Sequence, residues 1–249
     1  MSGPAPLRRQ DRAFTPDSHR TPGTPATSRR TLSAMRETFR AELDTLIGDL
    51  ARTARLAAQM MTNATTALSQ ADLGLAELVI SSEGEMKALC EDMDQRSVKL
   101  LVLQAPVATD LRMVIAATHT VGDLQRMCNL AQHIAKIARM KHPTVPVPGD
   151  VRPVFARMSV LATRLAENAA TAIESRDPLS GGRLAEIDDE VDALRRRIFR
   201  ILFSEDWSHG VEPAVDAALI GRYYERFADH AVAIARQVNF LVTGLPPER

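Results

Sequence analysis

Apolar residues recur at intervals of three and four along most of the chain, from about residue 33 to residue 243. This spacing places them on one face of an α-helix, whose period is 3.6 residues. No segment shows the sustained strict alternation that would predict a strand. Breaks in the pattern divide this part of the chain into six predicted helices, at residues 33–69, 73–103, 107–141, 151–175, 181–204 and 209–243. The pattern therefore predicts an all-α fold.

The breaks between the predicted helices carry turn and capping chemistry. Asp72 and Asp177 precede predicted helices and are expected to be N-cap residues. The segment 142–150 contains three prolines, which remove backbone donors and favour extended geometry, so it is expected to be a linker. Short connections elsewhere favour antiparallel neighbours. We therefore expect a tandem pair of antiparallel three-helix bundles, at residues 34–141 and 151–245.

The second half of the chain repeats the first. A constant shift of 105 positions relates a set of residues in the two halves: Asn63 to Asn168, Ala64 to Ala169, Ala67 to Ala172, Leu68 to Ile173, Asp72 to Asp177 and Leu89 to Leu194. Further along, the segment 124–129 lies 100 positions before the similar segment 224–229. The chain is therefore read as a tandem duplication, with one bundle in each copy.

Composition supports a helical protein and limits its class. The 249 residues include only 4% aromatic side chains, and alanine, leucine and arginine favour helices. Residues 1–33 differ, because they are rich in proline, arginine, serine and threonine and have no apolar periodicity. Such a segment buries too little apolar surface to order itself, so we expect a disordered N-terminal extension.

Charge and cysteine usage narrow the function and the compartment. The formal net charge is zero, which argues against a dedicated nucleic-acid-binding protein. Two cysteines, Cys90 and Cys128, without a CxxC motif favour free thiols in a reducing compartment. No apolar run approaches the roughly 18–20 residues of a membrane span, and no hydrophobic signal core is present. We therefore expect a cytoplasmic protein without direct membrane insertion.

Two pairs of acidic residues form the candidate site. Glu225 and Asp229 are four residues apart on the last predicted helix, on nearly the opposite side from its apolar seam. Asp188 and Asp192 have the same spacing on the preceding helix. If the turn centres near Asp206, the rise of 1.5 Å per residue brings the two pairs to overlapping levels. The four carboxylates are therefore expected to face one another across the outer groove of adjacent helices.

A group of oxygen ligands suits a hard or borderline cation such as Fe, Mn, Zn or Mg, with water completing the coordination. The alternative is a solvated polar helix face, because acids four residues apart are common on helices. The first copy has one acid, one amine and two amides at the corresponding positions: Glu83, Lys87, Gln125 and Asn129. That copy is predicted to bind metal weakly or not at all.

Three separated segments give the sequence a family resemblance. They are Gln104–Arg112 (QAPVATDLR), Met35–Leu43 (MRETFRAEL) and Glu225–Ala231 (ERFADHA). Their order and spacing resemble the PhoU family, which is associated with phosphate-specific transport. The resemblance covers about residues 35–245 and includes the duplication.

The resemblance implies two similar three-helix bundles with metal held at acid-xxx-acid motifs, here Asp188 with Asp192 and Glu225 with Asp229. It implies a negative regulator of phosphate uptake and of phosphate-starvation signalling. The expected partners are the ATPase subunit of the phosphate ABC transporter and the phosphate-sensing histidine kinase, met at the inner face of the membrane. A homodimer is also expected. Candidate partner contacts, on resemblance alone, are Asp110, Arg112 and Arg226. The first copy departs from the family's acid motif.

The sequence also bears on two other classes of function, an enzyme and a helical scaffold. The sequence has no glycine-rich phosphate loop and no nucleophile elbow, so an enzyme is not expected. A ferritin-like di-metal oxidase needs inward-facing Glu-x-x-His motifs, whereas Glu225 and Asp229 have a different spacing and face away from the seam. The remaining alternative is a helical metal-binding or scaffold protein that has diverged from phosphate regulation.

Overall fold

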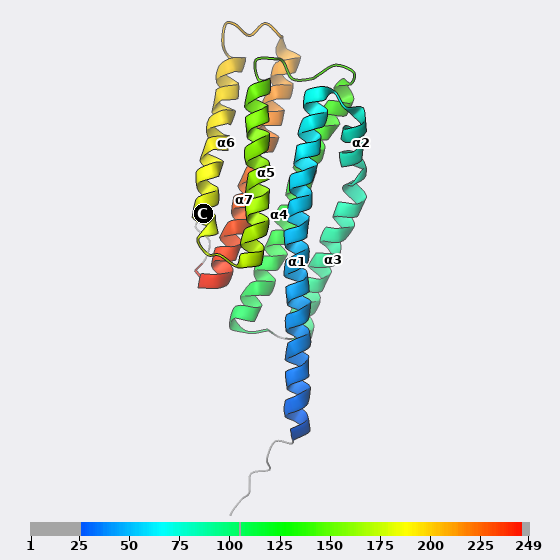
Figure 1. Ribbon diagram of the computed structural model, residues 1–249, viewed down its shortest axis with the longest axis vertical. Helices are drawn as coiled ribbons and strands as arrows, with labels where there is room; N and C mark the ends of the chain where they lie inside the picture. The colour runs from blue at the N-terminus through cyan, green and yellow to red at the C-terminus, as the bar shows by residue number, and fades with distance from the viewer. Residues whose placement is uncertain (1–25, 105, 246–249) are drawn as a thin grey trace, which may run out of the picture. The chain divides into compact units, whose positions relative to one another are not determined.

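The computed structural model describes residues 26–104 and 106–245, and helices are the only regular elements in these two ranges (Figure 1). Seven helices follow one another along the chain: α1 (Ala26–Gln70), α2 (Leu73–Ser81), α3 (Glu83–Gln104), α4 (Ala108–Lys141), α5 (Arg152–Ser175), α6 (Ser180–Leu202) and α7 (Val211–Thr243). The chain divides into two units, residues 1–38 and residues 39–249. The predicted all-α class is confirmed.

The smaller unit contains the first part of α1. Its helix begins at Ala26, earlier than the predicted start at residue 33. Within it, the Thr38 hydroxyl donates to the Ala34 carbonyl. The predicted disorder of residues 1–33 falls mostly on residues 1–25, which lie outside the described residues.

One predicted helix is interrupted. Residues 73–103 form two helices, α2 and α3, that meet at Ser82. The Ser82 hydroxyl donates to the Val79 carbonyl, and the Ser81 hydroxyl donates to the Leu78 carbonyl. Serine side chains that bond the preceding turn compete with the helical backbone ladder and bend helices. The period of the apolar residues continues through this short break, so periodicity alone did not reveal it.

The two predicted N-caps have different outcomes. Asp72 is the N-cap of α2, where its carboxylate accepts from the Leu75 N–H at 3.0 Å, as predicted. Asp177 is not an N-cap, because α6 begins three residues later at Ser180. Its carboxylate instead accepts from the Leu179 N–H in the preceding turn and forms an ion pair with Arg183. The aspartate therefore organises the turn before the helix.

Within residues 39–249, α1, α2–α3 and α4 form one three-helix set, and α5, α6 and α7 form the other (Figure 1). The segment 142–150 contains no helix and connects the two sets. Helix α4 packs against α2, α3 and α7, while α7 also packs against α5 and α6. The buried residues form one contiguous cluster that includes members of both sets. The two bundles therefore share a core.

Three hydroxyl groups lie where helices of the two repeats meet. The Tyr224 hydroxyl of α7 lies 2.6 Å from the Thr65 hydroxyl of α1, and the Ser159 hydroxyl of α5 donates to Thr65 at 2.9 Å. Tyr224 is completely buried, and burial raises the pKa of its hydroxyl. Buried polar groups need partners, because an unpaired one costs about 1–3 kcal/mol. This hydroxyl cluster therefore fixes the relative register of α1, α5 and α7.

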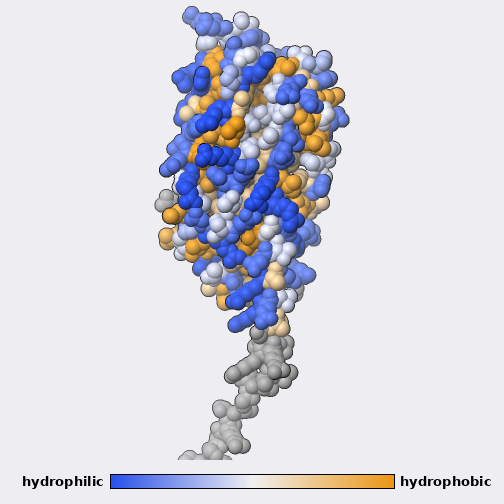
Figure 2. Space-filling model, viewed as in Figure 1, coloured by the Kyte–Doolittle hydropathy of each residue, from blue (hydrophilic) through white to orange (hydrophobic). Residues whose placement is uncertain are grey.

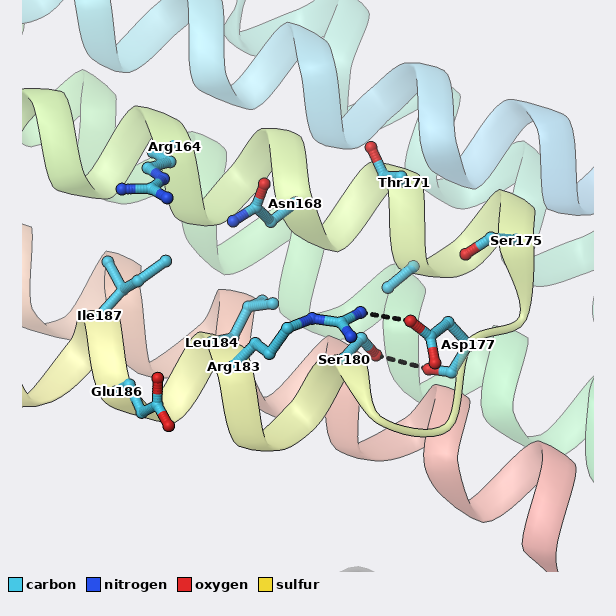
Figure 3. Close-up of a pocket in the computed structure, with 11 residues that line it drawn as sticks. Arg164, Asn168, Thr171, Ser175, Asp177, Ser180, Arg183, Leu184, Glu186 and Ile187 are labelled. Atoms are coloured by element: carbon cyan, nitrogen blue, oxygen red, sulfur yellow. Dashed lines mark hydrogen bonds and ion pairs between the residues drawn. The ribbon is translucent and has the colours of Figure 1, made fainter.

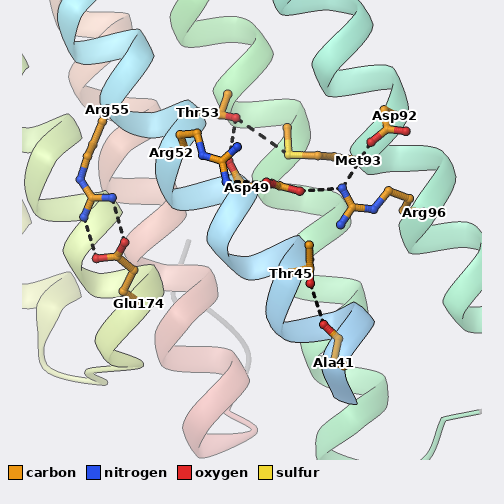
Figure 4. Close-up of polar contacts among 10 residues, drawn as sticks. All are labelled: Ala41, Thr45, Asp49, Arg52, Thr53, Arg55, Asp92, Met93, Arg96 and Glu174. Atoms are coloured by element: carbon orange, nitrogen blue, oxygen red, sulfur yellow. Dashed lines mark hydrogen bonds and ion pairs between the residues drawn. The ribbon is translucent and has the colours of Figure 1, made fainter. Parts of the chain in front are cut away.

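Charged contacts along α1 connect it to both repeats (Figure 4). Arg55 forms a bidentate pair with Glu174 of α5, at 2.8 and 2.6 Å. Six residues earlier, on the opposite side of α1, Asp49 accepts from Arg96 of α3 at 2.6 Å. The Arg55–Glu174 pair is exposed and contributes little stability, whereas the Asp49–Arg96 pair is partly buried. Both pairs orient the helices around a core formed by apolar burial.

The face seen in Figure 2 is mainly hydrophilic, with hydrophobic residues in separate patches. Among the helices in the described ranges, none combines the length and the apolar character needed to cross a bilayer.

Candidate functional site

The acidic candidate site lies where α6 and α7 pack against each other. On α6, Val191 and Ile198 are buried in the core. On α7, Phe227 and Ile234 are buried in the same way. Tyr224, next to Glu225, is fully buried, whereas its neighbour Tyr223 is only partly buried. The buried sector of α7 is therefore wider than the predicted seam, and it extends toward Glu225.

Asp188 has the most unusual environment of the four acids. Its Oδ1 atom is buried and has no hydrogen-bond partner among the described residues. Burial, followed by the negative charges of Asp229 and Asp192, raises its pKa to about 7. Desolvation and nearby like charge both disfavour the ionised form. Asp188 is therefore an acid whose charge is poorly compensated by its own protein.

Asp229 shares this environment from the other helix. Partial removal of water raises its pKa first, and the charges of Glu225 and Asp192 raise it further, while Arg222 and Arg226 lower it. Carboxylates from α6 and α7 therefore lie close enough to act on one another. This is the juxtaposition that the overlapping helix levels predict.

Glu225 differs from the other three acids because arginines neutralise it. Its side chain is only 11% exposed, although the sequence places it on the outer face. Arg222, one turn earlier on α7, donates to Glu225 Oε2. Arg195 of α6 approaches the same oxygen, with its Nε at 3.3 Å, and its guanidinium also lies over the Phe199 ring. Arg195 was not among the predicted site residues, because its only signal in the sequence is its position one turn after Asp192.

The four acids do not form a closed coordination cage. Within the part of the chain that the structure describes, no three His, Cys, Asp or Glu side chains converge closely enough to hold a metal ion. Asp192 is half-buried and lies 4.0 Å from Arg196. Among the described residues, three of the carboxylates accept no hydrogen bond from an arginine, whereas the fourth, Glu225, is held by Arg222. It suits an open site completed by water better than a buried catalytic one.

The first repeat has a corresponding groove that lacks the net negative charge of the α6–α7 groove. The four counterpart residues line one pocket of about 250 Å³ between α3 and α4, together with Met86 and Cys128: Glu83, Lys87, Gln125 and Asn129. Lys136 donates to Glu83 at 3.2 Å, so the single acid of this groove is paired. Burial raises the pKa of Cys128 to about 12, so its thiol is neutral at physiological pH. This groove therefore offers no group of free oxygen ligands.

The three candidate partner-contact residues have different surroundings. Arg112 is partly buried, and its guanidinium donates to the Leu241 carbonyl at 3.4 Å and to the Thr109 hydroxyl at 3.1 Å. It thus caps the end of α7 from the first turns of α4. Arg226 is exposed on α7, and Asp110 is half-buried in the first turn of α4. Arg112 has an internal structural role that the sequence did not reveal.

Another contact between the repeats was missed. His230 of α7 lies 2.9 Å from Asp123 of α4, through its Nδ1 atom. His133 of α4 stacks on Tyr223, with ring centroids 5.1 Å apart. Both contacts join residues about 100 positions apart in the sequence, and no local pattern could have paired them. They lie on the interface between α4 and α7 rather than in the acidic site.

Comparison with known proteins supports the repeat assignment and the fold. A sequence description of the PhoU domain matches the chain twice, at residues 50–138 and 155–238. The chain is 44% identical to the phosphate-specific transport system accessory protein PhoU homolog 2 of Mycobacterium tuberculosis over 213 residues, which cover 86% of this chain and all of that protein. It is 36% identical over 173 residues to the PhoU homolog of Synechocystis, covering 69% of this chain and 75% of that one.

Two solved structures are also similar. The crystal structure of PhoU from Pseudomonas aeruginosa has a TM-score of 0.77 and 25% identity, and the match covers 83% of this chain and all of that one. The phosphate transport system regulatory protein PhoU from Streptococcus pneumoniae has a TM-score of 0.76 at 22% identity, covering 85% of this chain and all of that one. Because the identity to the Streptococcus pneumoniae protein is only 22%, this second match shows similarity of fold alone.

Proposed function

The chain belongs to the PhoU family, and we propose that it is a negative regulator of phosphate uptake and of phosphate-starvation signalling. The observation that carries this proposal is the match of the PhoU domain to both repeats, together with 44% identity to a phosphate-transport accessory protein along that protein's whole length. The family consists of accessory and regulatory proteins rather than enzymes, so the chain acts by binding.

The proposed partners are the ATPase subunit of a phosphate ABC transporter and a phosphate-sensing histidine kinase. The proposal places the chain in the cytoplasm, as a homodimer that reaches the inner face of the membrane through these partners. Asp110 and Arg226 are the proposed contact residues, because neither is enclosed by the fold. Arg112 is retained as a contact through the nitrogens that remain free after it caps α7.

We further propose that the α6–α7 groove binds a divalent cation, with Asp188, Asp192, Asp229 and Glu225 as its oxygen ligands. The buried and unpartnered Oδ1 of Asp188 supports this, since a cation there would compensate a carboxylate that the protein leaves uncompensated. Carboxylate ligands suit Mg or Mn and also accommodate Fe or Zn. A bound cation would neutralise the like charges on α6 and α7 and hold the two helices together.

A promoter assay tests the regulatory role. In a strain that lacks the gene and grows in ample phosphate, a high-affinity phosphate-transporter promoter should become derepressed. Expression of residues 35–249 should restore repression, since both domain matches lie inside that range. A promoter that stays fully repressed in the deletion strain would argue for the alternative, a helical scaffold that has diverged from phosphate regulation.

A further inference from the structure

A second polar cavity lies in the second repeat, between α5 and α6 and on the side of α6 that faces α5 (Figure 3). We call it the α5–α6 pocket. Its volume is about 410 Å³, within the usual range for sites that hold small molecules. The lining combines cations, hydroxyls and amides with an apolar floor: Arg164, Asn168, Thr171, Ala172, Ser175, Asp177, Ser180, Arg183, Leu184, Glu186 and Ile187.

Two donors on α5 have no partner. Among the residues that the structure describes, neither the Arg164 guanidinium nor the Asn168 amide makes a hydrogen bond, and both residues line the pocket from α5 (Figure 3). The nearby Glu190 is neutralised mainly by Arg157, and Arg164 adds only a longer-range attraction. One turn separates Arg164 from Asn168, so their donors lie on the same wall of the pocket.

Arg183 supplies donors from the other wall. Its guanidinium is held by Asp177, whose pKa that contact lowers, so the pair remains ionised and fixed in place. A guanidinium has five N–H donors, and this pair leaves several of them available. The remaining acid of the lining, Glu186, points away from α5 in Figure 3 and does not oppose an anion there.

The first repeat provides an internal comparison. At the shift of 105 positions, Arg164 corresponds to Gln59 and Arg183 to Leu78. The amide of Gln59 donates to Asn63, the counterpart of Asn168, at 2.9 Å. In the first repeat the amide is therefore satisfied internally and both cations are replaced. The free donors in the second repeat are not a requirement of the bundle fold.

We propose that the α5–α6 pocket binds a small molecule that carries a phosphoryl group. Guanidinium groups bind phosphoryl oxygens through paired, charge-assisted hydrogen bonds. Donors on two opposing walls suit a tetrahedral oxyanion better than a planar carboxylate, which a single guanidinium can satisfy. The floor formed by Leu184, Ile187 and Ala172 accommodates the apolar part of such a molecule. The inference does not rest on the proposed regulatory role.

Titration calorimetry on the purified chain tests this inference, at constant ionic strength so that general screening does not differ between probes. The probes are inorganic phosphate, adenosine diphosphate and citrate. We expect a phosphate-bearing probe to bind more tightly than citrate. The double variant Arg164→Gln with Arg183→Leu, which copies the first repeat, should weaken that binding roughly tenfold or more, since it removes two charge-assisted contacts.

Matched controls separate the pocket from overall charge. Arg126→Gln with Arg139→Leu makes the same change in charge at exposed positions of α4, and it should leave binding unchanged. Asn168→Ala removes one neutral donor and should weaken binding less than the arginine variant does. It also tests the pocket if the double variant does not fold, as judged by circular dichroism.

The outcomes separate the sources of the phosphoryl group. Tight binding of inorganic phosphate identifies the free ion as ligand, and preferential binding of adenosine diphosphate identifies a phosphorylated metabolite. The proposal fails if citrate binds as tightly as both phosphate probes, if each probe has a Kd above about 10 mM, or if neither the arginine variant nor Asn168→Ala weakens binding. The promoter assay is unaffected by these results, so the regulatory role and the pocket can fail independently.

Discussion

The α3–α4 and α6–α7 grooves occupy equivalent positions in the two repeats but differ in charge. In the α6–α7 groove, Glu225 is buried beside Arg195. At the same positions of the first repeat stand Gln125 and Cys90, and Cys90 is buried as a neutral thiol. The first repeat therefore forms its three-helix set without a charged pair at these positions. Because buried ion pairs are weak evidence for stability, their presence in one repeat is better explained by binding.

The largest expected effect concerns metal binding. Glu225→Gln with Asp229→Asn, which copies the first repeat, should lower the amount of bound metal at least about tenfold, because carboxylates are the preferred ligands of hard cations. The measurement is elemental analysis after stripping the metal and reloading with Mn²⁺. Asn129→Ala in the α3–α4 groove is the matched control and should change nothing. If the double variant kept its full metal content, the proposed difference in metal binding between the two grooves would be contradicted.

The next effect concerns the buried charge pair. Arg195→Ala should lower the free energy of unfolding by about 2 kcal/mol, because it leaves Glu225 buried with only the partly exposed Arg222 as partner. Combining it with Glu225→Gln should recover most of the loss, as no uncompensated charge then remains. Urea denaturation measures both variants.

The neighbouring Arg196, which is exposed, serves as the control for this experiment. Arg196→Ala should cost less than about 0.5 kcal/mol, since surface pairs contribute little. If the variant with both changes is no more stable than Arg195→Ala alone, Arg195 and Glu225 are not energetically coupled.

The stability of the metal-free protein should depend on pH through Asp188. Its pKa in the folded state is raised to about 7, above the value of about 3.9 in an unfolded chain. The folded state therefore binds more protons between these values, and stability falls as pH rises from about 4 to 7. With allowance for solvent screening, the loss should be about 1 kcal/mol.

Asp188→Asn should remove this loss when unfolding is measured with a chelator present. The Asn variant should then be more stable than the parent chain at pH 7 and similar to it at pH 4. Glu83→Gln, at the equivalent position in the first repeat, is the control and should leave the slope in place. If the parent chain gained stability relative to Asp188→Asn between pH 4 and pH 7, the buried environment assigned to Asp188 would be contradicted.

The smallest effect concerns Arg112, which belongs to the first repeat but caps a helix of the second. Arg112→Ala should lower stability by about 0.5 kcal/mol, because a carbonyl at the end of α7 loses a donor. Arg226→Ala should leave stability unchanged, since that side chain is exposed. Thermal unfolding distinguishes the two, and equal effects would show that Arg112 has no capping role.

Much of the fold could be predicted from sequence, because helical periodicity and capping act locally. The N-cap at Asp72 and the linker at residues 142–150 follow from the chemistry of a few adjacent residues. The duplication also identified equivalent grooves in the two repeats. The four residues predicted to correspond to the acids of the second repeat line one pocket in the first repeat.

The missing parts depend on packing between helices. Periodicity gives the angle of a residue around its own helix, but not which neighbour covers it. Glu225 was therefore placed outside, although α6 covers it and brings Arg195 to its carboxylate. The pair of His230 and Asp123 joins residues 107 positions apart, and only the folded chain brings them together.

The hydroxyl cluster of Thr65, Ser159 and Tyr224 also bears on how such a protein diverges after gene duplication. Because it draws its members from both halves, neither half can be cut away without stripping a buried hydroxyl of its partner. Each repeat thus relies on the other for this buried contact. Mutations in the interior must suit both halves at once, whereas the outer grooves are free to drift apart, and a new specialisation can arise in one half while the other preserves the architecture.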